Sequence, residues 1–278
     1  MRRREVLSLL GALPVGGLSV AAGEHSVLLG NPADRLKLVV RDSGQPGPLY
    51  FAPHDDENIA VRAVERRWQS RPSGVLIELR QTGRRYIYQH LGGRRLWCDP
   101  NRMYSEPQVV AAQITALRPK CAVVPPAAAS FGPMDLDLAG AHFARIGAQV
   151  LATLGEWLGR SYGPLVGVHN NTDGSLNVGN VFKRSEKPVV HRATGADPDD
   201  FFLVTEAGDF DALRTLGFNV VLQPVRTADD GSLSVWAARN RVRYFNAEAQ
   251  HRDCLDYDRA RGHLDYQIRM LRALESLL

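Results

Sequence analysis

Short apolar runs alternate with amphipathic stretches along most of the chain. A run of four or five apolar residues is typical of a buried strand, whereas apolar residues three and four apart indicate a helix packed against a core. The pattern predicts strands at 49–52, 75–79, 165–169, 201–205, 220–222 and 242–246, and helices after residue 58, at 108–117, 140–158 and 210–216, and at the C-terminus. Strands that alternate with helices favour an α/β fold, with a mixed, largely parallel sheet sandwiched by helices.

Two short stretches depart from this alternation. Residues 85–90 and 95–98 flank a pair of glycines, a spacing that predicts a β-hairpin. The stretch 31–47 is polar and charged, and no element is assigned to it. The stretch 123–133 is rich in proline and alanine and is expected to be an irregular loop, and no segment has the pattern of a domain linker. We therefore expect one domain over residues 23–278.

The N-terminus has the pattern of an export signal. Arginines at positions 2 to 4 precede an apolar stretch, 6–22, that ends in small residues. This stretch is short and glycine-rich for a membrane span. Its start resembles a twin-arginine signal, which serves proteins that cross a membrane already folded. We expect residues 1–22 to be an export signal that leads to the periplasm or the outside of the cell; an apolar first core helix is the alternative.

Composition narrows the range of partners. The formal net charge is +4, from 34 basic and 30 acidic residues, and the basic residues are dispersed. We therefore expect no nucleic-acid partner, and no stable membrane span in the mature chain. The three cysteines, Cys98, Cys121 and Cys254, lack zinc-finger spacing. An oxidising compartment would permit one disulfide, and Cys98 with Cys121 is the expected pair. The oligomeric state stays open.

Side chains capable of chemistry gather where the predicted strands end. His54 and Glu57 follow the first strand, His169 ends another, and Glu248 follows the last. A further polar segment, 99–102, follows the hairpin. In open α/β sheets, ligands bind at the carboxyl ends of the strands. We therefore expect these side chains to share one site.

Two histidines and a glutamate are a known ligand set for catalytic zinc. His54 and Glu57 are three residues apart at a strand-to-helix turn, so both can point to one spot, with His169 as the third ligand. Zinc would lower the pKa of its bound water, and Glu248 would take a proton from that water and pass it to a leaving amine. Each residue also has an ordinary structural interpretation, as a helix cap, a strand-end histidine or a surface carboxylate. Their combination at one sheet edge favours the metal site.

Four motifs, taken in order, resemble those of the zinc carboxypeptidases. The segment 53–57, Pro-His-Asp-Asp-Glu, resembles their His-x-x-Glu metal motif, and 99–102, Asp-Pro-Asn-Arg, resembles their Asp-x-Asn-Arg segment. The segment 166–169, Val-Gly-Val-His, resembles the strand that bears their last zinc ligand. The segment 244–248, Tyr-Phe-Asn-Ala-Glu, resembles the strand that bears their general base. The resemblance covers about residues 49–248.

The resemblance implies that family's fold, and it implies the zinc and base roles already assigned. It further implies that Asn101 and Arg102 bind a substrate carboxylate, and that Arg102 helps to polarise the scissile carbonyl. The chain departs from the family at two points. No tyrosine occurs between residues 163 and 244, where the family has one on a loop upstream of the base. The family also uses a further arginine, for which four hairpin arginines compete and Arg85 is taken as the candidate: Arg84, Arg85, Arg94 and Arg95.

The function implied by this resemblance is zinc-dependent hydrolysis of a peptide or amide bond. The enzyme would be a metallopeptidase or amidase for a carboxylate-bearing substrate, such as a cell-wall peptide or an N-acyl amino acid. One alternative is a small-molecule N-deacylase or sugar N-deacetylase; another is an exported ligand-binding protein without activity. The segment 54–57 loosely resembles a His-Pro-Asp-Asp-Glu signature of sugar N-deacetylases, but the chain lacks the two histidines three residues apart that this family needs. Asp55 and Asp56 are otherwise expected to complement the dipole of the following helix.

Overall fold

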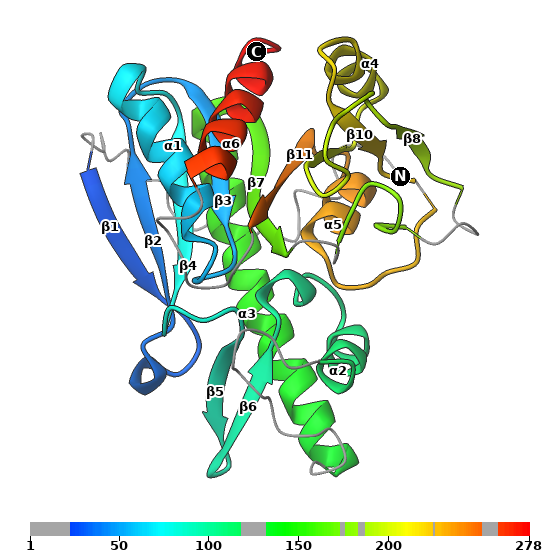
Figure 1. The fold of residues 1–278 in the computed structure, drawn as a ribbon. Helices are drawn as coiled ribbons and strands as arrows, with labels where there is room; N and C mark the ends of the chain where they lie inside the picture. Colours follow the sequence, from blue (N-terminus) through cyan, green and yellow to red (C-terminus); the bar gives the residue numbers. More distant parts are fainter. Residues whose placement is uncertain (1–22, 118–131, 173–175, 183–186, 225, 252–260) are drawn as a thin grey trace.

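A nine-stranded sheet forms the centre of the molecule, with the strand order β1-β2-β4-β3-β7-β11-β9-β10-β8 (Figure 1). The computed structural model describes residues 23–117, 132–172, 176–182, 187–224, 226–251 and 261–278. The strands of the sheet are β1 (Gly23–Leu28), β2 (Lys37–Asp42), β3 (Gly47–Ala52), β4 (Val75–Arg80), β7 (Tyr162–Thr172), β8 (Val189–His191), β9 (Phe201–Val204), β10 (Asn219–Leu222) and β11 (Tyr244–His251). The predicted hairpin forms a separate two-stranded sheet of β5 (Ile87–Leu91) and β6 (Arg94–Cys98).

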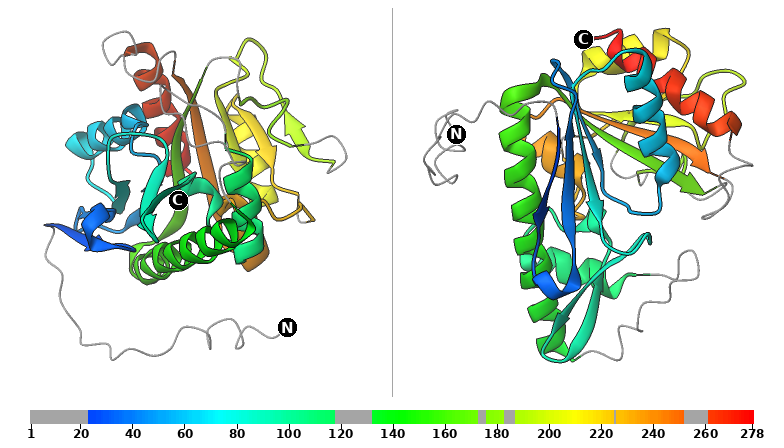
Figure 2. Two further views of the ribbon diagram at one scale, coloured as in Figure 1. Left: turned by 90° about the horizontal axis from the view of Figure 1, so that it is seen from below. Right: turned by 90° about the vertical axis from the view of Figure 1, so that its left-hand side faces the viewer.

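Helices cover both faces of the sheet (Figure 2). One face carries α1 (Asn58–Ser70), α4 (Ala207–Thr215) and α6 (Arg261–Glu275), and the other carries α2 (Pro107–Thr115), α3 (Pro133–Ser161) and α5 (Leu233–Asn240). Two short 3-10 turns, η1 (Pro32–Asp34) and η2 (Pro100–Arg102), precede β2 and α2. Each face has its own apolar core, because side chains along a strand alternate between the two faces.

The mixed α/β class predicted from the sequence is confirmed. The four central strands β4, β3, β7 and β11 are parallel to one another. Antiparallel pairs lie outside this centre, between β1 and β2, β2 and β4, β11 and β9, and β10 and β8, while β9 and β10 are parallel. The parallel centre matters for function, because the carboxyl ends of its strands meet at one edge.

The elements that the sequence did not predict are β1, β2, β8 and α5. The stretch 31–47, to which no element was assigned, contains β2, where only Leu38 and Val40 are buried and both ends are charged. Short, charged strands near a sheet edge have little apolar signal. The last strand was expected at 242–246, but β11 starts at Tyr244 and extends to His251. Its later half alternates small and polar residues, which hid its length.

Several predictions fall on residues that the structure does not describe. These include the export signal at 1–22, and also Cys121 and Cys254. Cys98 is a buried free thiol, and its Sγ donates to the backbone carbonyl of Asp99 at 3.3 Å, which contradicts the expected pairing with Cys121. Among the described residues, no helix combines the length and the apolar character needed to cross a bilayer.

Candidate metal centre

The candidate site lies where the central parallel strands end. His54 follows β3, His169 lies on β7, and Glu248 lies on the neighbouring strand β11, directly opposite His169 in the register. Along β7, His169 points to the α3 side of the sheet, as does Leu165 in the core on that side. Strand order and register therefore bring residues far apart in sequence to one place.

His54, Glu57 and His169 form a buried cluster. One potential ligand atom from each lies within 4.8 Å of those of the other two. The Nδ1 atom of His54 lies 2.7 Å from Glu57 Oε1, and the Nδ1 atom of His169 lies 3.0 Å from Glu57 Oε2. Glu57 is the N-cap residue of α1, yet its side chain makes no capping hydrogen bond. The carboxylate is instead directed between the two imidazole rings.

The base of the hairpin contributes two further charged groups. Asp99 follows β6, and its Oδ1 accepts a hydrogen bond from His54 Nε2 at 2.9 Å. Arg85 precedes β5; its guanidinium contacts Asp99 Oδ2 at 3.1 Å and Glu57 Oε1 at 3.0 Å. Asp99 holds the far nitrogen of His54, which leaves Nδ1 to face Glu57. A carboxylate behind a histidine is the usual way to orient a metal-binding imidazole.

The charges in this cluster shift one another's pKa values. Burial and Arg85 lower the pKa of His54, but Glu57 and Asp99 outweigh them and raise it to about 9. Burial raises the pKa of Glu57, and the charges of His54 and His169 outweigh this and bring it well below the usual range. Burial likewise raises the pKa of Asp99, but the charges of Arg85 and His54 outweigh burial and bring this pKa well below its usual value. Without a metal, the carboxylate charges are thus compensated by cationic side chains.

Glu248 lies in the same cavity and differs from Glu57 in its electrostatics. Burial, together with the negative charge of Glu57, raises the pKa of Glu248 despite the opposing charge of His169. Its Oε1 accepts a hydrogen bond from Asn246 Nδ2 at 3.1 Å. A carboxylate with a raised pKa that is held by one neighbour suits proton transfer.

One cavity of about 230 Å³ joins every site residue that the sequence predicted. Its lining contains the three candidate ligands and the candidate base, the two hairpin-base groups and the carboxylate-binding candidates: His54, Glu57, His169, Glu248, Arg85, Asp99, Asn101 and Arg102. Asn101 Oδ1 accepts a hydrogen bond from the backbone amide of Leu233 at 3.4 Å, and Arg102 pairs with Asp230 at 3.0 Å. Both residues lie closer to solvent than the candidate ligands do.

Among the four candidate arginines, the structure places Arg85 in this cavity. Arg94 pairs with Asp135 in an exposed position, and the guanidinium of Arg95 lies over the Tyr88 ring, 4.6 Å from its centroid. Arg84 is exposed and does not line the cavity. Arg85 differs from the other three because its guanidinium reaches Glu57 and Asp99, beside the ends of the central strands.

The expected role of Asp55 is wrong. Its Oδ2 accepts hydrogen bonds from the backbone amides of Gln81 and Gly83 at 2.7 and 2.6 Å, and its Oδ1 pairs with Arg80 at 2.8 Å. Asp55 therefore holds the segment after β4 and does not complement the dipole of α1. Because α1 begins only at Asn58, this carboxylate lies before the helix.

The remaining lining residues, to which the sequence assigned no role of their own, are Tyr86, Asn170, Asn171, Thr172 and Leu176. Three of them directly follow His169 on β7, so the strand-end position of that histidine was an available signal. Tyr86 adjoins Arg85 at the start of the hairpin and carried no comparable signal.

The donor set fits a zinc ion. Two imidazoles and a carboxylate, gathered within bonding reach of a common point, are the protein ligands of many catalytic zinc sites. His54 Nδ1, Glu57 and His169 could each supply one bond. In the described part of the chain, His169 Nε2 is buried and has no hydrogen-bond partner, so this nitrogen is available to bind a metal.

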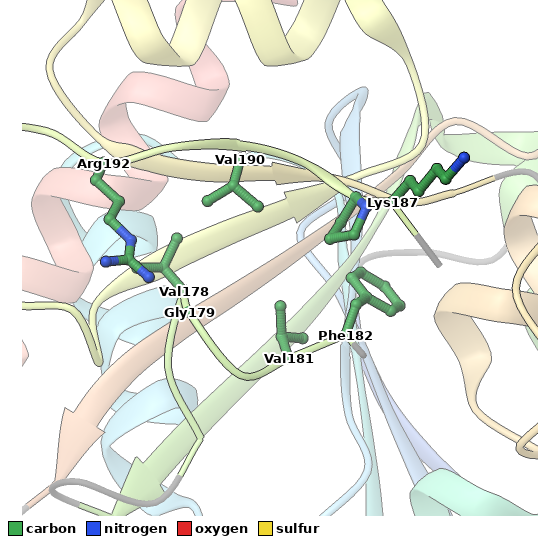
Figure 3. Close-up of a pocket in the computed structure, with 8 residues that line it drawn as sticks. Val178, Gly179, Val181, Phe182, Lys187, Val190 and Arg192 are labelled. Atoms are coloured by element: carbon green, nitrogen blue, oxygen red, sulfur yellow. The ribbon is translucent and has the colours of Figure 1, made fainter. Parts of the chain in front are cut away.

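A larger cavity, of about 540 Å³, lies apart from this site between the segment after β7 and the edge strand β8 (Figure 3). Its described lining is mostly apolar, with two basic side chains, Lys187 and Arg192. The other residues that line it are Val178, Gly179, Val181, Phe182, Pro188 and Val190. This described lining contains neither a carboxylate nor a histidine.

Comparison with known proteins gives only distant likenesses. No protein-family model matches the sequence, and no curated protein matches it. Succinylglutamate desuccinylase from Chromobacterium violaceum has a TM-score of 0.44 at 12% identity, with 92% of this chain and 70% of that chain covered. A gene product from Agrobacterium tumefaciens has a TM-score of 0.49 at 12% identity, with 90% and 99% covered. Murein-tripeptide amidase from Escherichia coli O157 has a TM-score of 0.44 at 16% identity, with 98% and 96% covered. Scores below 0.5 at such identities assign neither a family nor an activity to this chain.

Proposed function

We propose that the protein is a zinc-dependent hydrolase of a peptide or amide bond, of the zinc carboxypeptidase type. The observation that carries the proposal is the burial of His54, Glu57 and His169 around one point, with Glu248 in the same cavity. The order of the four motifs along the chain supports the same proposal. A pure binding site has no need of a second, unpaired carboxylate with a raised pKa beside the ligand set.

In this proposal, His54, Glu57 and His169 hold the zinc, and Asp99 keeps the His54 ring in the orientation that turns Nδ1 to the metal. When bound, zinc supplies a lowered pKa for its water and polarises a substrate carbonyl. Arg85 lies behind the cluster and neutralises the carboxylates of Glu57 and Asp99.

Glu248 is the proposed general base. It takes a proton from the attacking water and delivers it to the leaving amine. Its raised pKa brings the proton affinity of Glu248 closer to that of the water and the amine with which it exchanges a proton. Asn246 holds one of its oxygens and leaves the other for the water.

Arg102 and Asn101 are the proposed anchors for a substrate carboxylate. Arg102 is paired only with the partly exposed Asp230 among the ion pairs of the described residues, and exposed ion pairs contribute little to stability. A substrate carboxylate can therefore replace Asp230 at low cost and gain a charge-assisted, two-point contact. Arg85 is a second anchor if the substrate reaches the floor of the cavity.

The substrate class follows from the proposed location. An export signal at residues 1–22 would deliver the protein to the periplasm or outside the cell, where cell-wall peptides are carboxylate-bearing amides. The cavity of about 230 Å³ is smaller than typical ligand pockets, which favours a slim substrate group. This size supports a small-molecule N-deacylase, acting on an N-acyl amino acid, as the second candidate. The sugar N-deacetylase alternative loses support because Asp55 holds a turn and does not face the ligand set.

Glu248→Gln tests the proposal. We expect this variant to keep about one zinc per chain and to lose at least about 100-fold in kcat, because proton transfer by a positioned base contributes on that order. Murein fragments, peptides and N-acyl amino acids would be screened against zinc-loaded protein. Glu106→Gln is the matched control, because Glu106 is exposed and its side chain does not cap α2.

Three outcomes separate the alternatives. Unchanged turnover in Glu248→Gln would reject Glu248 as the base. Absence of zinc from the wild-type protein would reject the proposed metal centre. Binding of a screened ligand that survives chelation, without turnover, would favour the ligand-binding protein.

A further inference from the structure

Two side-chain amides behind the ligand set connect α6, β7 and α1. Gln267 of α6 is fully buried, and its Nε2 donates to the backbone carbonyl of His169 at 3.0 Å. Its Oε1 accepts a hydrogen bond from Asn170 Nδ2 at 3.0 Å. The Oδ1 atom of Asn170 in turn accepts from the backbone amide of Ala60 at 2.9 Å. This network, the Gln267–Asn170 pair, thus joins the candidate ligand His169 to the start of α1, where the candidate ligand Glu57 is the N-cap residue.

The contact with Ala60 replaces a missing helix cap. Ala60 is the third residue of α1, and the amide at that position is normally satisfied by the side chain of the N-cap residue. The N-cap residue is Glu57, whose carboxylate faces His54 and His169 instead. Asn170 therefore supplies from β7 the acceptor that Glu57 cannot supply. Gln267 Oε1 and, at 3.4 Å, the backbone carbonyl of Ala249 both accept from Asn170 Nδ2, and these contacts together turn the Oδ1 end of the Asn170 amide to Ala60.

We infer that the Gln267–Asn170 pair is the positioning device of the metal centre. It holds His169 through its backbone and Glu57 through the first turn of α1, and so sets their separation before a metal arrives. Gln267 does not line the cavity, since it packs from α6 on the opposite face of the sheet. Its influence on the metal must pass through the two ligands. This inference rests on the proposed function and deepens it.

Gln267→Met tests the inference, because methionine has a similar length and keeps the apolar packing but can neither donate to His169 nor accept from Asn170. We expect zinc affinity to fall about 10-fold or more, the usual effect of removing a group that orients a ligand. We also expect the visible spectrum of the cobalt-substituted protein to change, since it reports the geometry of the ligands. Gln267→Leu, an uncharged good helix former that likewise makes neither hydrogen bond, is the second variant if the methionine lowers the folded fraction.

Glu275→Met is the matched control. Glu275 lies on the same helix and joins α6 to α1 through Arg67 at 2.5 Å and to β3 through Tyr50 at 3.0 Å. It is eight residues from Gln267, about 12 Å along the helix and away from the ligands. A general loosening of α6 should affect both variants alike. We expect only Gln267→Met to weaken zinc binding, even where the two lower the melting temperature equally.

A double-mutant cycle adds a readout that simple destabilisation would not give. Asn170→Ala removes the acceptor for Ala60, and the two residues act through one connected contact. The double variant should therefore weaken zinc binding by no more than about the larger single effect. Multiplied losses in affinity would show two independent contributions and overturn the pair as a unit.

The outcomes separate this inference from the proposed function. If the wild-type protein binds zinc and Gln267→Met binds it equally well, the inference fails and the proposed function stands. If the wild-type protein binds no zinc, the proposed function fails. Crystal structures of metal-free wild type and Gln267→Met then decide the inference by themselves. A separation of His169 Nδ1 and Glu57 Oε2 that stays at the wild-type 3.0 Å in the variant would overturn it.

Discussion

Zinc binding should tighten as the pH rises from about 6.5 to about 8.5, because zinc competes with a proton for His54. In the metal-free protein, burial and Arg85 lower the pKa of His54. The negative charges of Glu57 and Asp99 outweigh both effects and raise this pKa to about 9. The ring therefore carries a proton on both nitrogens at neutral pH. Its Nδ1 must lose that proton before it can hold a metal.

The size of the effect follows from this pKa. At pH 7, about two units lower, only about 1% of the metal-free protein has a neutral His54 ring. Protonation then weakens apparent zinc binding about 100-fold, which corresponds to about 2.7 kcal/mol. The affinity should rise about tenfold for each pH unit and level off above the pKa. The direction of this pH dependence follows from the raised pKa of His54. The folded, metal-free state favours the charged ring, and the ring loses that charge as the pH rises.

Zinc titrations against a competing chelator across this pH range measure the slope. Calorimetry in buffers with different ionisation enthalpies counts the protons released, and we expect about one per zinc at pH 7 from His54. Asp99→Asn removes one of the two carboxylates that raise the pKa of His54, so its pH dependence should be shallower. Zinc affinity that is equal at both ends of the range, with no proton release, would refute a protonated His54 between Glu57 and Asp99.

Two further predictions concern Asp200, which precedes β9, and Gly167 on β7. Asp200→Asn should stabilise the protein by up to about 3 kcal/mol near pH 7.5. Burial raises the pKa of Asp200 to about 6, so above that pH the folded state disfavours the charged carboxylate that the unfolded state carries. The gain in stability, measured by urea denaturation, should therefore vanish near pH 4. An asparagine Oδ1 can still accept the hydrogen bond that Gln250 donates at 2.7 Å, and equal stabilities at pH 7.5 would contradict the prediction. Gly167→Ala should destabilise by about 1–3 kcal/mol and weaken zinc binding, because its Cβ would lie 2.4 Å from Tyr244 Oη and 3.3 Å from His169 Nε2. Adding Tyr244→Phe should restore much of the loss, and a failure of this rescue would exclude the clash as its cause.

Much of the candidate site could be predicted because it depends on where strands end. Apolar runs locate the ends of β3, β7 and β11, and parallel strands bring those ends to one edge. The polar residues that follow such runs, His54, His169 and Glu248, were therefore identifiable without knowledge of the strand order. The sheet edges were less predictable, since β1 and β2 carry a weak and partly charged pattern.

The choice among the hairpin arginines could not be made from the sequence. Arg84 and Arg85 are neighbours in the chain, and both precede β5. Which of them meets Glu57 and Asp99 depends on how the hairpin leaves the sheet, a tertiary feature with no local signal. Gln267 was equally hidden, because 98 residues separate it from the His169 carbonyl that it binds. A lone glutamine on an amphipathic helix is expected at the surface, and only the packing of α6 against the sheet buries it.

The start of α1 shows why local rules fail at this site. Helices usually begin with a residue whose side chain caps the first amides, and Glu57 occupies that position without capping. Locally, this costs α1 a hydrogen bond; globally, it frees a carboxylate to lie between His54 and His169. The missing contact is restored from β7 by Asn170, so the helix start and the ligand geometry depend on each other. A change that restores a good local cap at position 57, such as Glu57→Ser, would leave α1 intact and remove the carboxylate at the centre of the candidate ligand set. Sequence rules favour that serine, and the natural glutamate is therefore best explained by function.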